Sequence, residues 1–548
     1  MAPEPKRVLL LYTDKYYLVK QVYPFGLDLI ANHLRQFGHY VTIEFPFLPN
    51  ADPESNLKEI LERTDPDFIG LGFRNLDTTM SCEQYGEHTG PGYKTYYFFP
   101  ELKRLVQILR NHRSEAPIIA GGGAFTISPV VILERLGIEY GIVGQGEEPL
   151  RQFLEAFPDE RKISDIPNMV FKYGDDFHVN PVRSYTFQEL STLHHREEKF
   201  NYAYENAGLP VQTKRGCNQN CSYCVEPFIE GRRFIFKNQG EVIEELMTIA
   251  EKLDGVKTIF FVDTEFNLPD LGYCSVLVKE IMKSGLHEHF RFSSQFLPRP
   301  FDHAFAKLLA EAGFAIILTC DSFADSVLEK NGSSYRQKDI IETIELCEKF
   351  SIDCTLALIF GLPGETYDTI NHTIRQMMYY TPNAFRRYEY TVGGRIYQGT
   401  PLCHFVEQQG VDHNLYGKKS AGHIEPYYYC SPASPMKLKA YIERTLPFPT
   451  IYQNKFDETR QQTLAISYLV DQNRWHEATA RYFESDLTAR ASVYDYLFRK
   501  LVDSDRTEAA RDISEHLLEA LLQSKKSAEN KDQVAVVQYY LSLLPTSG

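Results

Sequence analysis

Hydrophobic and polar positions alternate in long blocks along residues 6–157. Arg7–Tyr12 is a mostly apolar run that predicts a fully buried strand, and Phe25–Phe37 has the apolar spacing of a helix that stops at Gly38. Further strands are predicted at Tyr40–Phe45, Phe68–Phe73, Pro117–Gly122 and Tyr140–Val143. This alternation indicates an α/β fold with a flavodoxin-like (Rossmann-like) doubly wound sheet, whose ligands lie beyond the carboxyl ends of the strands.

A second block of alternation, with a longer repeat, runs from Leu209 to about Val392. It predicts strand–helix units whose strands lie near Val211–Lys214, Thr258–Asp263, Arg291–Phe296, Ala315–Asp321, Cys354–Gly361 and Arg387–Val392. These units suit a partial (β/α)6 barrel of the TIM type better than a closed eight-unit barrel. As in full barrels, chemistry is expected at the carboxyl ends of the strands.

The remaining segments are less regular. Residues 158–208 are polar and mixed, which predicts a linker packed between two domains, and the charged run around His194 and His195 predicts a solvated face rather than a metal site. From about Asp457 to Leu544 the pattern is helical, with Leu497 and Leu501 in a small helical core. We therefore expect an N-terminal sheet domain (1–157), a linker (158–208), a barrel (209–400) and a mostly helical C-terminal region (401–548).

Composition narrows the class of protein. The 548 residues carry a net charge of −15, from 73 acidic and 58 basic side chains, which argues against a nucleic-acid partner. No apolar run reaches the length of a membrane span, and the first residues lack the apolar core of a signal peptide. The ten cysteines do not form the pattern of a secreted disulfide framework, so we expect a cytoplasmic protein.

Three cysteines, Cys217, Cys221 and Cys224, lie within eight residues of a polar loop that begins after Gly216. Such spacing lets three thiols surround one corner of a metal centre. Zinc normally takes four protein ligands at a structural site, whereas a 4Fe–4S cluster held by three thiolates leaves one iron open for a substrate or cofactor. The alternative is three unrelated buried thiols, since free cysteine is a common core residue.

The sequence Cys-x-x-x-Cys-x-aromatic-Cys, with Tyr223 as the aromatic residue, resembles the signature of the radical S-adenosylmethionine (radical SAM) enzymes. The resemblance implies a 4Fe–4S cluster on the three cysteines and SAM chelated to the open iron. One electron then cleaves SAM to methionine and a 5′-deoxyadenosyl radical. An external electron donor of the flavodoxin or ferredoxin type is implied.

Other ends of predicted barrel strands extend this resemblance. The segment with Asp263 and Glu265 is similar to the family's second-strand motif, which meets the amino end of SAM. Ser293 and Gln295 could bind a ribose or a carboxylate, Asp321 resembles the family's fourth-strand aspartate, and Gly361 and Pro363 belong to a Gly-x-Pro-Gly-Glu element near the adenine. Alternatively, each of these residues simply caps a strand-to-helix turn, because Ser, Asp and Gly suit such positions.

The predicted ends of the first sheet carry small and polar residues. Arg74 and Asn75 follow the third strand, Gly121 and Gly122 end the fourth, and Gly144, Gly146 and Glu147 follow the fifth. No Gly-x-Gly-x-x-Gly follows the first strand, which disfavours a nicotinamide cofactor. Each glycine alone could close a tight turn. Together they resemble the cobalamin-binding domain of cobalamin-dependent radical SAM enzymes, with Gln145 in place of the first Glu of a Gly-Glu-Gly-Glu-like element.

The chain lacks the Asp-x-His-x-x-Gly motif whose histidine binds cobalt in many cobalamin proteins. The resemblance therefore implies base-off cobalamin without a histidine ligand. Arg74 would either lie near the lower face of the corrin or pair with Asp77. After the sixth predicted strand, Arg395-Ile-Tyr-Gln-Gly-Thr-Pro is similar to a segment of the same branch, with Gln398 in place of Pro.

Taken together, the resemblance implies a cobalamin-dependent radical SAM methyltransferase that moves a methyl group from methylcobalamin to an unactivated carbon of a small molecule or peptide. Within the enzyme class the alternative is a non-methylating relative, such as an oxidative cyclase or a ring-contraction or rearrangement enzyme. A tRNA methylthiolase is disfavoured, because the N-terminal domain lacks a second cysteine triad. The alternative from another class is a corrinoid-binding sensor or carrier, for which degraded cysteine and Gly-Leu-Pro-Gly-Glu motifs would be expected.

Overall fold

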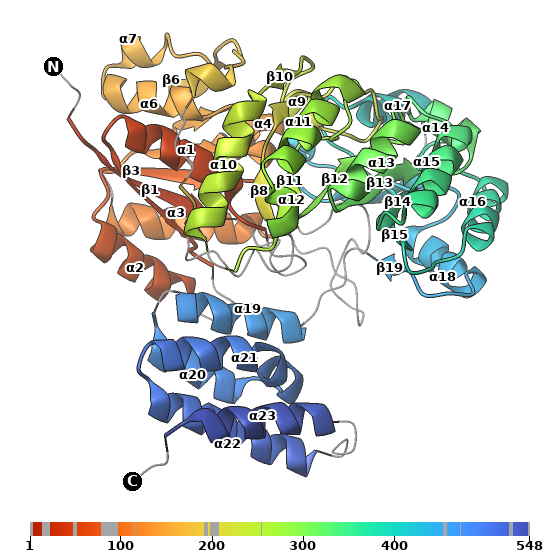
Figure 1. Ribbon diagram of the computed structural model, residues 1–548. Helices are drawn as coiled ribbons and strands as arrows, with labels where there is room; N and C mark the ends of the chain where they lie inside the picture. The colour runs from red at the N-terminus through yellow and green to blue at the C-terminus, as the bar shows by residue number, and fades with distance from the viewer. Residues whose placement is uncertain are drawn as a thin grey trace.

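The computed structural model describes residues 4–13, 22–47, 52–77, 97–113, 115–190, 195–197, 208–253, 255–410, 412–452, 458–471, 473–524 and 530–545. Two α/β units lie side by side, and the last helices form a separate lobe beside the first unit (Figure 1). None of the described helices combines the length and the apolar character needed to cross a membrane.

The first unit is a seven-stranded sheet with the order β2-β1-β3-β4-β5-β6-β7. The first five strands are parallel and confirm the predicted flavodoxin-like order; they are β1 (Arg7–Tyr12), β2 (Tyr40–Glu44), β3 (Phe68–Gly72), β4 (Ile118–Gly121) and β5 (Tyr140–Ile142). Their helices are α1 (Phe25–Gln36), α2 (Pro53–Thr64), α3 (Phe99–His112), α4 (Gly123–Ile127), α5 (Pro129–Leu136), α6 (Glu147–Ala156) and α7 (Glu160–Ile163).

The prediction of a linker over residues 158–208 is wrong for its central part. β6 (Met169–Tyr173) and β7 (Asp176–Val179) form an antiparallel hairpin that extends the sheet from β5. The start of β6 supplies buried apolar residues, Met169 to Phe171, which belong to the core although the surrounding sequence is polar. Beyond this hairpin the described residues include a short 3-10 turn, Phe187–Glu189.

The second unit is a partial barrel of parallel strands in the order β8-β11-β12-β13-β14-β15-β19. Five of them match predicted strands: β11 (Thr258–Phe261), β12 (Arg291–Phe296), β13 (Phe314–Asp321), β14 (Cys354–Phe360) and β15 (Arg386–Val392). The first, β8 (Leu209–Val211), shares only Val211 with the predicted first strand. β19 (Ile451–Tyr452) adds a short edge strand from the C-terminal region. The predicted first strand is displaced, because Lys214 and Arg215 (β9) pair instead with β10 (Ile235–Phe236).

Helices follow the barrel strands, and a small three-stranded sheet comes after β15 in the chain. The helices are α9 (Glu226–Ile229), α10 (Gln239–Lys252), α11 (Leu271–Lys283), α12 (Leu286–His289), α13 (His303–Glu311), α14 (Asp325–Lys330), α15 (Gln337–Phe350), α16 (Tyr367–Tyr379), α17 (Pro401–Gln409) and α18 (Pro435–Thr445). The small sheet has the order β16-β18-β17, from β16 (Gly394–Arg395), β17 (Leu415–Gly417) and β18 (Tyr427–Tyr429); the 3-10 turns Asp412–Asn414 and Ala421–His423 flank β17.

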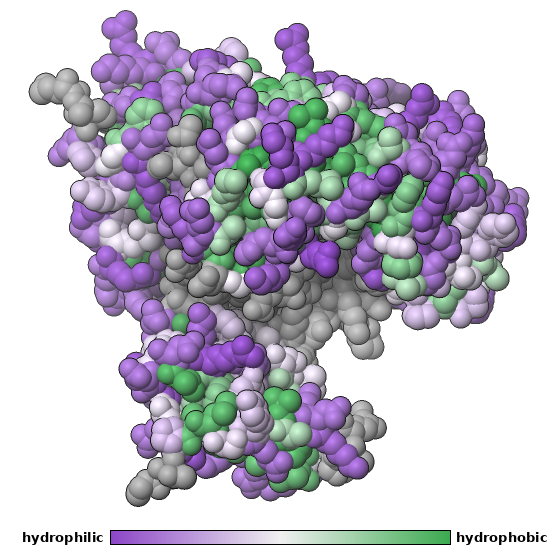
Figure 2. Space-filling view, viewed as in Figure 1, coloured by the Kyte–Doolittle hydropathy of each residue, from purple (hydrophilic) through white to green (hydrophobic). Residues whose placement is uncertain are grey.

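The C-terminal lobe is helical, as predicted, from α19 onward. It contains α19 (Glu458–Asp471), α20 (Trp475–Glu484), α21 (Leu487–Asp503), α22 (Thr507–Gln523) and α23 (Lys531–Leu543). Leu497 and Leu501 are fully buried in its core, which confirms the prediction for both. Apolar residues also gather on the visible face of this lobe (Figure 2).

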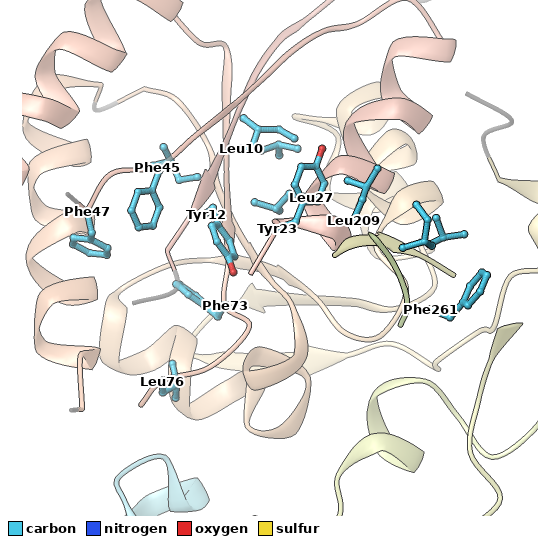
Figure 3. Close-up of a cluster of buried hydrophobic side chains, with 14 of the residues drawn as sticks. Leu10, Tyr12, Tyr23, Leu27, Phe45, Phe47, Phe73, Leu76, Leu209 and Phe261 are labelled. Carbon is cyan, nitrogen blue, oxygen red and sulfur yellow. The ribbon is translucent and has the colours of Figure 1, made fainter. Parts of the chain in front are cut away.

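One hydrophobic core continues from the first unit into the second. Tyr23 and Leu27, from α1 and the segment before it, lie beside Leu209 of β8, and Phe261 of β11 continues the cluster into the barrel (Figure 3). β8 is thus the strand at which the sheet domain and the barrel share buried apolar surface (Figure 1). Removing this surface from water stabilises the relative placement of the two units.

Candidate active site

The cysteine loop follows β9 and begins at a position that only glycine can occupy. Gly216 has φ +103°, and a Cβ on it would lie 2.2 Å from the carbonyl oxygen of Arg233. The Cys217 N–H donates to the carbonyl of Gly231 at 3.0 Å, so the loop closes on itself directly behind the first thiol. The sequence therefore turns sharply at Gly216 and directs the three cysteines beyond the end of the strand.

The loop is held from the outside by the barrel. Ser222 donates through its Oγ to Asn331 Oδ1 at 2.6 Å and through its N–H to the Asn331 carbonyl at 2.9 Å. Asn331 also donates from Nδ2 to the Pro363 carbonyl at 2.9 Å. The Ser222 carbonyl in turn accepts from the N–H of Leu402, at the start of α17. These bonds fix the loop between the ends of α14, β14 and α17.

The three thiols lie in a sparsely hydrated site. Cys217 is buried and Cys221 and Cys224 are half-buried. Burial raises the pKa of all three thiols, and the charges of Glu265 and of nearby carboxyl groups add to this effect. The charge of Cys224 also raises the pKa of Cys221. A positively charged metal centre beside these cysteines would favour their thiolate form.

Tyr223 connects the loop to the end of β13. Its hydroxyl donates to Asp321 Oδ1 at 2.7 Å, and the Tyr335 hydroxyl donates to Asp321 Oδ2 at 3.1 Å. Asp321 has φ +53° at a register shift of β13, which aims its carboxyl group toward the loop. Burial raises its pKa, although both tyrosines oppose this. The structure therefore brings Tyr223 and Asp321 together, and it adds Tyr335, which no sequence pattern had indicated.

Glu265 has one carboxylate oxygen without a hydrogen-bond partner. Thr319 donates to its Oε1 at 2.9 Å, while Oε2 is buried and has no hydrogen bond. Burial raises the pKa of Glu265 to about 8, and the charge of Asp321 adds to the increase. An unpaired buried oxygen is costly, so it marks a position where a cationic or hydrogen-bonding ligand would be stabilised.

Asp263, in contrast, is fully engaged within the chain. Its carboxylate accepts from the N–H and hydroxyl of Thr213 and from the N–H and Nζ of Lys214, the last at 2.8 Å. Lys214 also donates to the Phe266 carbonyl. This arrangement fixes the end of β11 against the strand that leads into the cysteine loop, which is a positioning role.

Ser293 and Gln295 lie on one face of β12, and both are partly exposed while Phe292, Ser294 and Phe296 are buried. Gly361 has φ +91°, and a Cβ there would lie 2.7 Å from Cys430 Sγ. Its N–H donates to Glu365 Oε2 at 3.3 Å. Pro363 contributes its carbonyl to Asn331, as described above. Gly361 and Pro363 thus shape the loop after β14.

The edge of the first sheet faces the cysteine loop. α4, which follows β4, contacts α9, which follows Cys224. A Cβ on Gly123 would lie 3.3 Å from Ile229 Cδ1, and one on Gly144 would lie 3.8 Å from the Ile229 carbonyl. Gly121 to Ala124 and Gly144 to Gly146 remain partly exposed along this edge. Gly122 has φ +101°, and its turn packs on the backbone of Phe73, where a Cβ would lie 2.5 Å from the carbonyl oxygen.

Arg74 is exposed at the end of β3, and Asn75 beside it is half-buried. The charge of Arg74 lowers the pKa of Glu226, the first residue of α9, against burial and the Glu230 charge, which together raise it to about 7. The predicted alternative partner of Arg74, Asp77, pairs with Arg395 at 3.4 Å. His194, predicted to lie on a solvated face, is outside the described residues.

Glu147 connects the two units, while Gln145 binds the segment that lies between them in the chain. Glu147 Oε1 accepts from Arg215 at 2.6 Å, and both side chains are buried. Burial alone would raise the pKa of Glu147, but the charge and hydrogen bond of Arg215 outweigh it and lower the pKa. Gln145 donates to the Tyr185 carbonyl at 3.1 Å. Since Arg215 directly precedes Gly216, this pair ties the edge of the first sheet to the cysteine loop.

Two buried arginines were missed or misread from the sequence. Arg395 donates to the carbonyls of Ile396, His423 and Tyr427 and pairs with Asp77, so it joins the barrel to the segment after β3. Arg196 lies in the charged run predicted to be solvated, yet it is buried and pairs with Asp28 and Glu245. His195 is largely exposed, as predicted. A run of charges in sequence does not reveal which member has buried partners.

Comparisons with known proteins agree with this architecture. Residues 18–154 match the B12 binding domain, and residues 211–377 match the radical SAM superfamily. The chain is similar to the tryptophan 2-C-methyltransferase of Streptomyces laurentii, with 25% identity over 422 residues that cover 65% of this chain and 67% of the relative. It is also similar to the uncharacterized methyltransferase PH0819 of Pyrococcus horikoshii, with 23% identity over 64% of this chain and 72% of that protein.

Solved structures share the fold. The radical SAM methyltransferase TsrM of Kitasatospora setae, with tryptophan and a SAM analogue bound, has a TM-score of 0.69 at 21% identity and covers 86% of this chain and 99% of its own. The cobalamin-dependent radical SAM enzyme OxsB, with aqua-cobalamin and SAM bound, has a TM-score of 0.64 at 14% identity and covers 99% of this chain and 84% of its own. The chain therefore combines a B12-binding domain with a radical SAM domain that follows it.

Proposed function

We propose that this enzyme is a C-methyltransferase that uses a 4Fe–4S cluster, SAM and cobalamin to methylate an unactivated carbon of a small molecule or peptide. The observation that carries the proposal is the contact between α4 and α9. It places the partly exposed edge of the B12-binding sheet next to the cysteine loop, so that two cofactors can serve one cavity.

The residues of the loop fit an iron–sulfur cluster. Cys217, Cys221 and Cys224 are the proposed ligands, because their spacing and their place beyond the strand end suit three thiolates on one cluster. When bound, the cluster supplies an open iron for SAM and the electron that cleaves it. The chain's own contribution is rigid placement of the loop through Gly216 and Ser222.

SAM would lie at the barrel strand ends. The unpaired Glu265 Oε2 suits the amino group of SAM, and Asp321, held by Tyr223 and Tyr335, lies on the same side. Ser293 and Gln295 offer polar groups on one face of β12, and the buried Gly361–Pro363 turn would contact the nucleoside through its backbone. Asp263 contributes by holding Lys214 and Thr213 rather than through a spare hydrogen-bonding position.

Cobalamin would lie against the backbone of Gly121 to Ala124 and Gly144 to Gly146, a partly exposed edge in which glycines predominate. When bound, it supplies a carrier for the methyl group. We propose the base-off form, since the sequence lacks the usual histidine motif. Arg74 and Asn75 lie at this edge and are the side chains assigned to the corrin, with Arg74 toward its lower face.

The buried surroundings hold the reacting groups close and limit water, which protects radical intermediates. The reducing electron is expected from a flavodoxin- or ferredoxin-type donor. A cytoplasmic location fits the free thiols, and the net charge of −15 makes nucleic acid an unsuitable substrate.

The function is tested by turnover of anaerobically reconstituted full-length protein with SAM, cobalamin and a reductant. Because similar proteins are named for or bind tryptophan, tryptophan and tryptophan-containing peptides are the first substrates to try. The expected result is a product heavier by one methyl group, with S-adenosylhomocysteine and 5′-deoxyadenosine formed in about equal amounts.

Three outcomes discriminate between mechanisms. Deoxyadenosine with a product of unchanged carbon count would contradict methyl transfer and favour a cyclase or rearrangement. Methylated product and S-adenosylhomocysteine without deoxyadenosine would retain methyl transfer and contradict the radical step. Cofactor binding without SAM consumption across a broad substrate panel would favour a corrinoid sensor or carrier.

A further inference from the structure

A second group of metal-ligand side chains lies outside the cysteine loop. Cys403 and Glu407 are on α17, and His423 ends the 3-10 turn Ala421–His423. Cys403 Sγ lies 3.6 Å from Glu407 Oε1 and 3.8 Å from His423 Nδ1. The three ligand atoms all lie within 4.8 Å of one another. Cys403 and His423 are buried, while Glu407 is open to solvent.

These spacings are close to those of a zinc site. With Zn–S near 2.3 Å and Zn–N or Zn–O near 2.0–2.2 Å, tetrahedral geometry puts the ligand atoms about 3.5 Å apart. Both distances from Sγ differ from that value by only a few tenths of an ångström. A thiolate, an imidazole and a carboxylate form a mixed donor set that zinc accepts, with a fourth position for water. Glu407 provides an exposed side for that water.

The fold brings the three residues together from separate elements. Cys403 and Glu407 are four residues apart on one helix, so they lie on the same face. His423 has φ +48° and follows Gly422 with φ +62°, a left-handed pair that turns the imidazole back toward α17. His404 Nδ1 is 3.9 Å from Glu407 Oε2, on the exposed side of the helix. Two cations lie nearby: Lys419 is exposed, so water screens its charge, and Arg395 is buried and paired with Asp77.

We propose that Cys403, Glu407 and His423 bind one zinc ion. The site is separate from the 4Fe–4S ligands, and it lies between an element that contacts the cysteine loop and one that contacts the B12-binding domain. α17 meets the cysteine loop, since Leu402 N–H donates to Ser222. The turn meets the B12-binding domain, since Ser128 Oγ donates to the Gly422 carbonyl at 2.7 Å and Arg135 pairs with Glu425 at 3.6 Å. Zinc would link α17, which contacts the cysteine loop, to the turn that contacts the B12-binding domain.

The test is metal analysis of full-length protein produced with zinc, purified anaerobically and measured before iron reconstitution. About one zinc per chain is expected, and X-ray absorption at the zinc edge should show one sulfur at about 2.3 Å with nitrogen and oxygen at about 2.0–2.2 Å. Zinc held by the empty cysteine loop would instead show three sulfurs. That result, or no bound zinc, would overturn the proposal.

Variants make the assignment specific. Cys403→Ser and His423→Gln should each lose nearly all of the zinc, whereas His404→Ala, a matched imidazole on the same helix, should keep it. The Cys217→Ala/Cys221→Ala/Cys224→Ala variant should also keep one zinc. Loss of zinc from that variant with retention in Cys403→Ser would place the metal in the cysteine loop. The absorption spectrum of the unsubstituted protein decides the question even if a variant fails to fold.

Discussion

The two cofactor-facing edges of this protein are built by opposite means. At the barrel strand ends, the candidate site is made of side chains. Three thiols, Glu265 and Asp321 lie there, and burial raises the pKa of each. At the edge of the first sheet, glycines predominate, and the surface offered is backbone. Two acidic residues beside that edge, Glu147 and Asp77, pair with Arg215 and Arg395 of the second unit, while Arg74 is exposed.

This difference reflects what each partner requires of the protein. A metal cluster must be ligated by specific atoms, so its site depends on residue identity and fails when one atom is lost. A large cofactor that binds to the backbone needs a surface of the right shape, so its site depends on small residues such as glycine that leave room for it. Substitutions should therefore abolish function at the barrel edge and erode stability or fit at the sheet edge.

The largest effect is expected from Cys217→Ala/Cys221→Ala/Cys224→Ala. Anaerobically reconstituted protein should bind about four irons per chain, and the variant should bind almost none and lose SAM cleavage. Iron content and the charge-transfer absorption of the cluster measure this. Cys347→Ala, a buried cysteine of α15, is the control and should retain the cluster. Iron and SAM cleavage in the triple variant would refute the assignment of the ligands.

At the sheet edge, Gly122→Ala should destabilise the fold without removing a functional atom. Its φ is +101°, and the new Cβ would meet the Phe73 carbonyl at 2.5 Å, so we expect a loss of about 3 kcal/mol or more, with weaker cobalamin binding. Gly137→Ala is the matched control, because it has φ +66° and nothing within 4 Å; it should cost only about 1 kcal/mol. Equal losses in denaturant unfolding would mean that crowding at Gly122 is unimportant.

Two buried glutamates should respond to pH in opposite directions. Burial raises the pKa of Glu365 to about 7, so its stabilising contribution is present below the unfolded value of 4.5 and is lost as pH rises toward 7. Arg215 lowers the pKa of Glu147 despite burial, so its contribution is present above 4.5 and is lost as pH falls.

Accordingly, Glu147→Gln should destabilise the protein more at pH 7 than at pH 4.5, since it leaves Arg215 buried without a charged partner. Glu365→Gln should be best tolerated at pH 7 or above, with a pH-dependent difference of at most about 3 kcal/mol. Unfolding curves of metal-free protein across this range measure both. The same pH slope for the two variants would contradict the opposite shifts.

The smallest effect is expected from Arg74→Ala. If Arg74 lies below the corrin, its removal should change the electron paramagnetic resonance spectrum of cobalt(II) while cobalamin remains bound. Lys103→Ala, on the adjacent α3, is a surface control of the same charge. Nitrogen superhyperfine splitting in the unsubstituted protein would show an axial base and contradict the base-off form.

Most of the fold and part of the site could be predicted from sequence, for identifiable reasons. Buried parallel strands are continuous apolar runs, so the predicted bounds of β1 to β5 and of most barrel strands agree with the structure within a few residues. The cysteine motif could be recognised because its three thiols are close together along the loop. The hairpin of β6 and β7 was missed because only the start of β6 is buried within a polar segment.

Long-range pairings were the other limit. Nothing near Glu147 in sequence indicates that its partner is Arg215, and Arg395 meets Asp77 across more than half the chain. Cys403 and Glu407 have the i, i+4 spacing of helical metal ligands, but His423 completes the group only through a left-handed turn. Tyr335 reaches Asp321 through the fold alone.

The continuous apolar core at β8 has a consequence for protein engineering. Tyr23 and Leu27 pack with Leu209 in one hydrophobic core. A fragment that ends near residue 157 would therefore expose hydrophobic surface, and so would the isolated barrel. Chimaeras that exchange the B12-binding half with that of a relative should aggregate unless the residues around Leu209 are exchanged with it. The two domains match separate family models, yet we expect that they can be exchanged only together with the residues of their shared core.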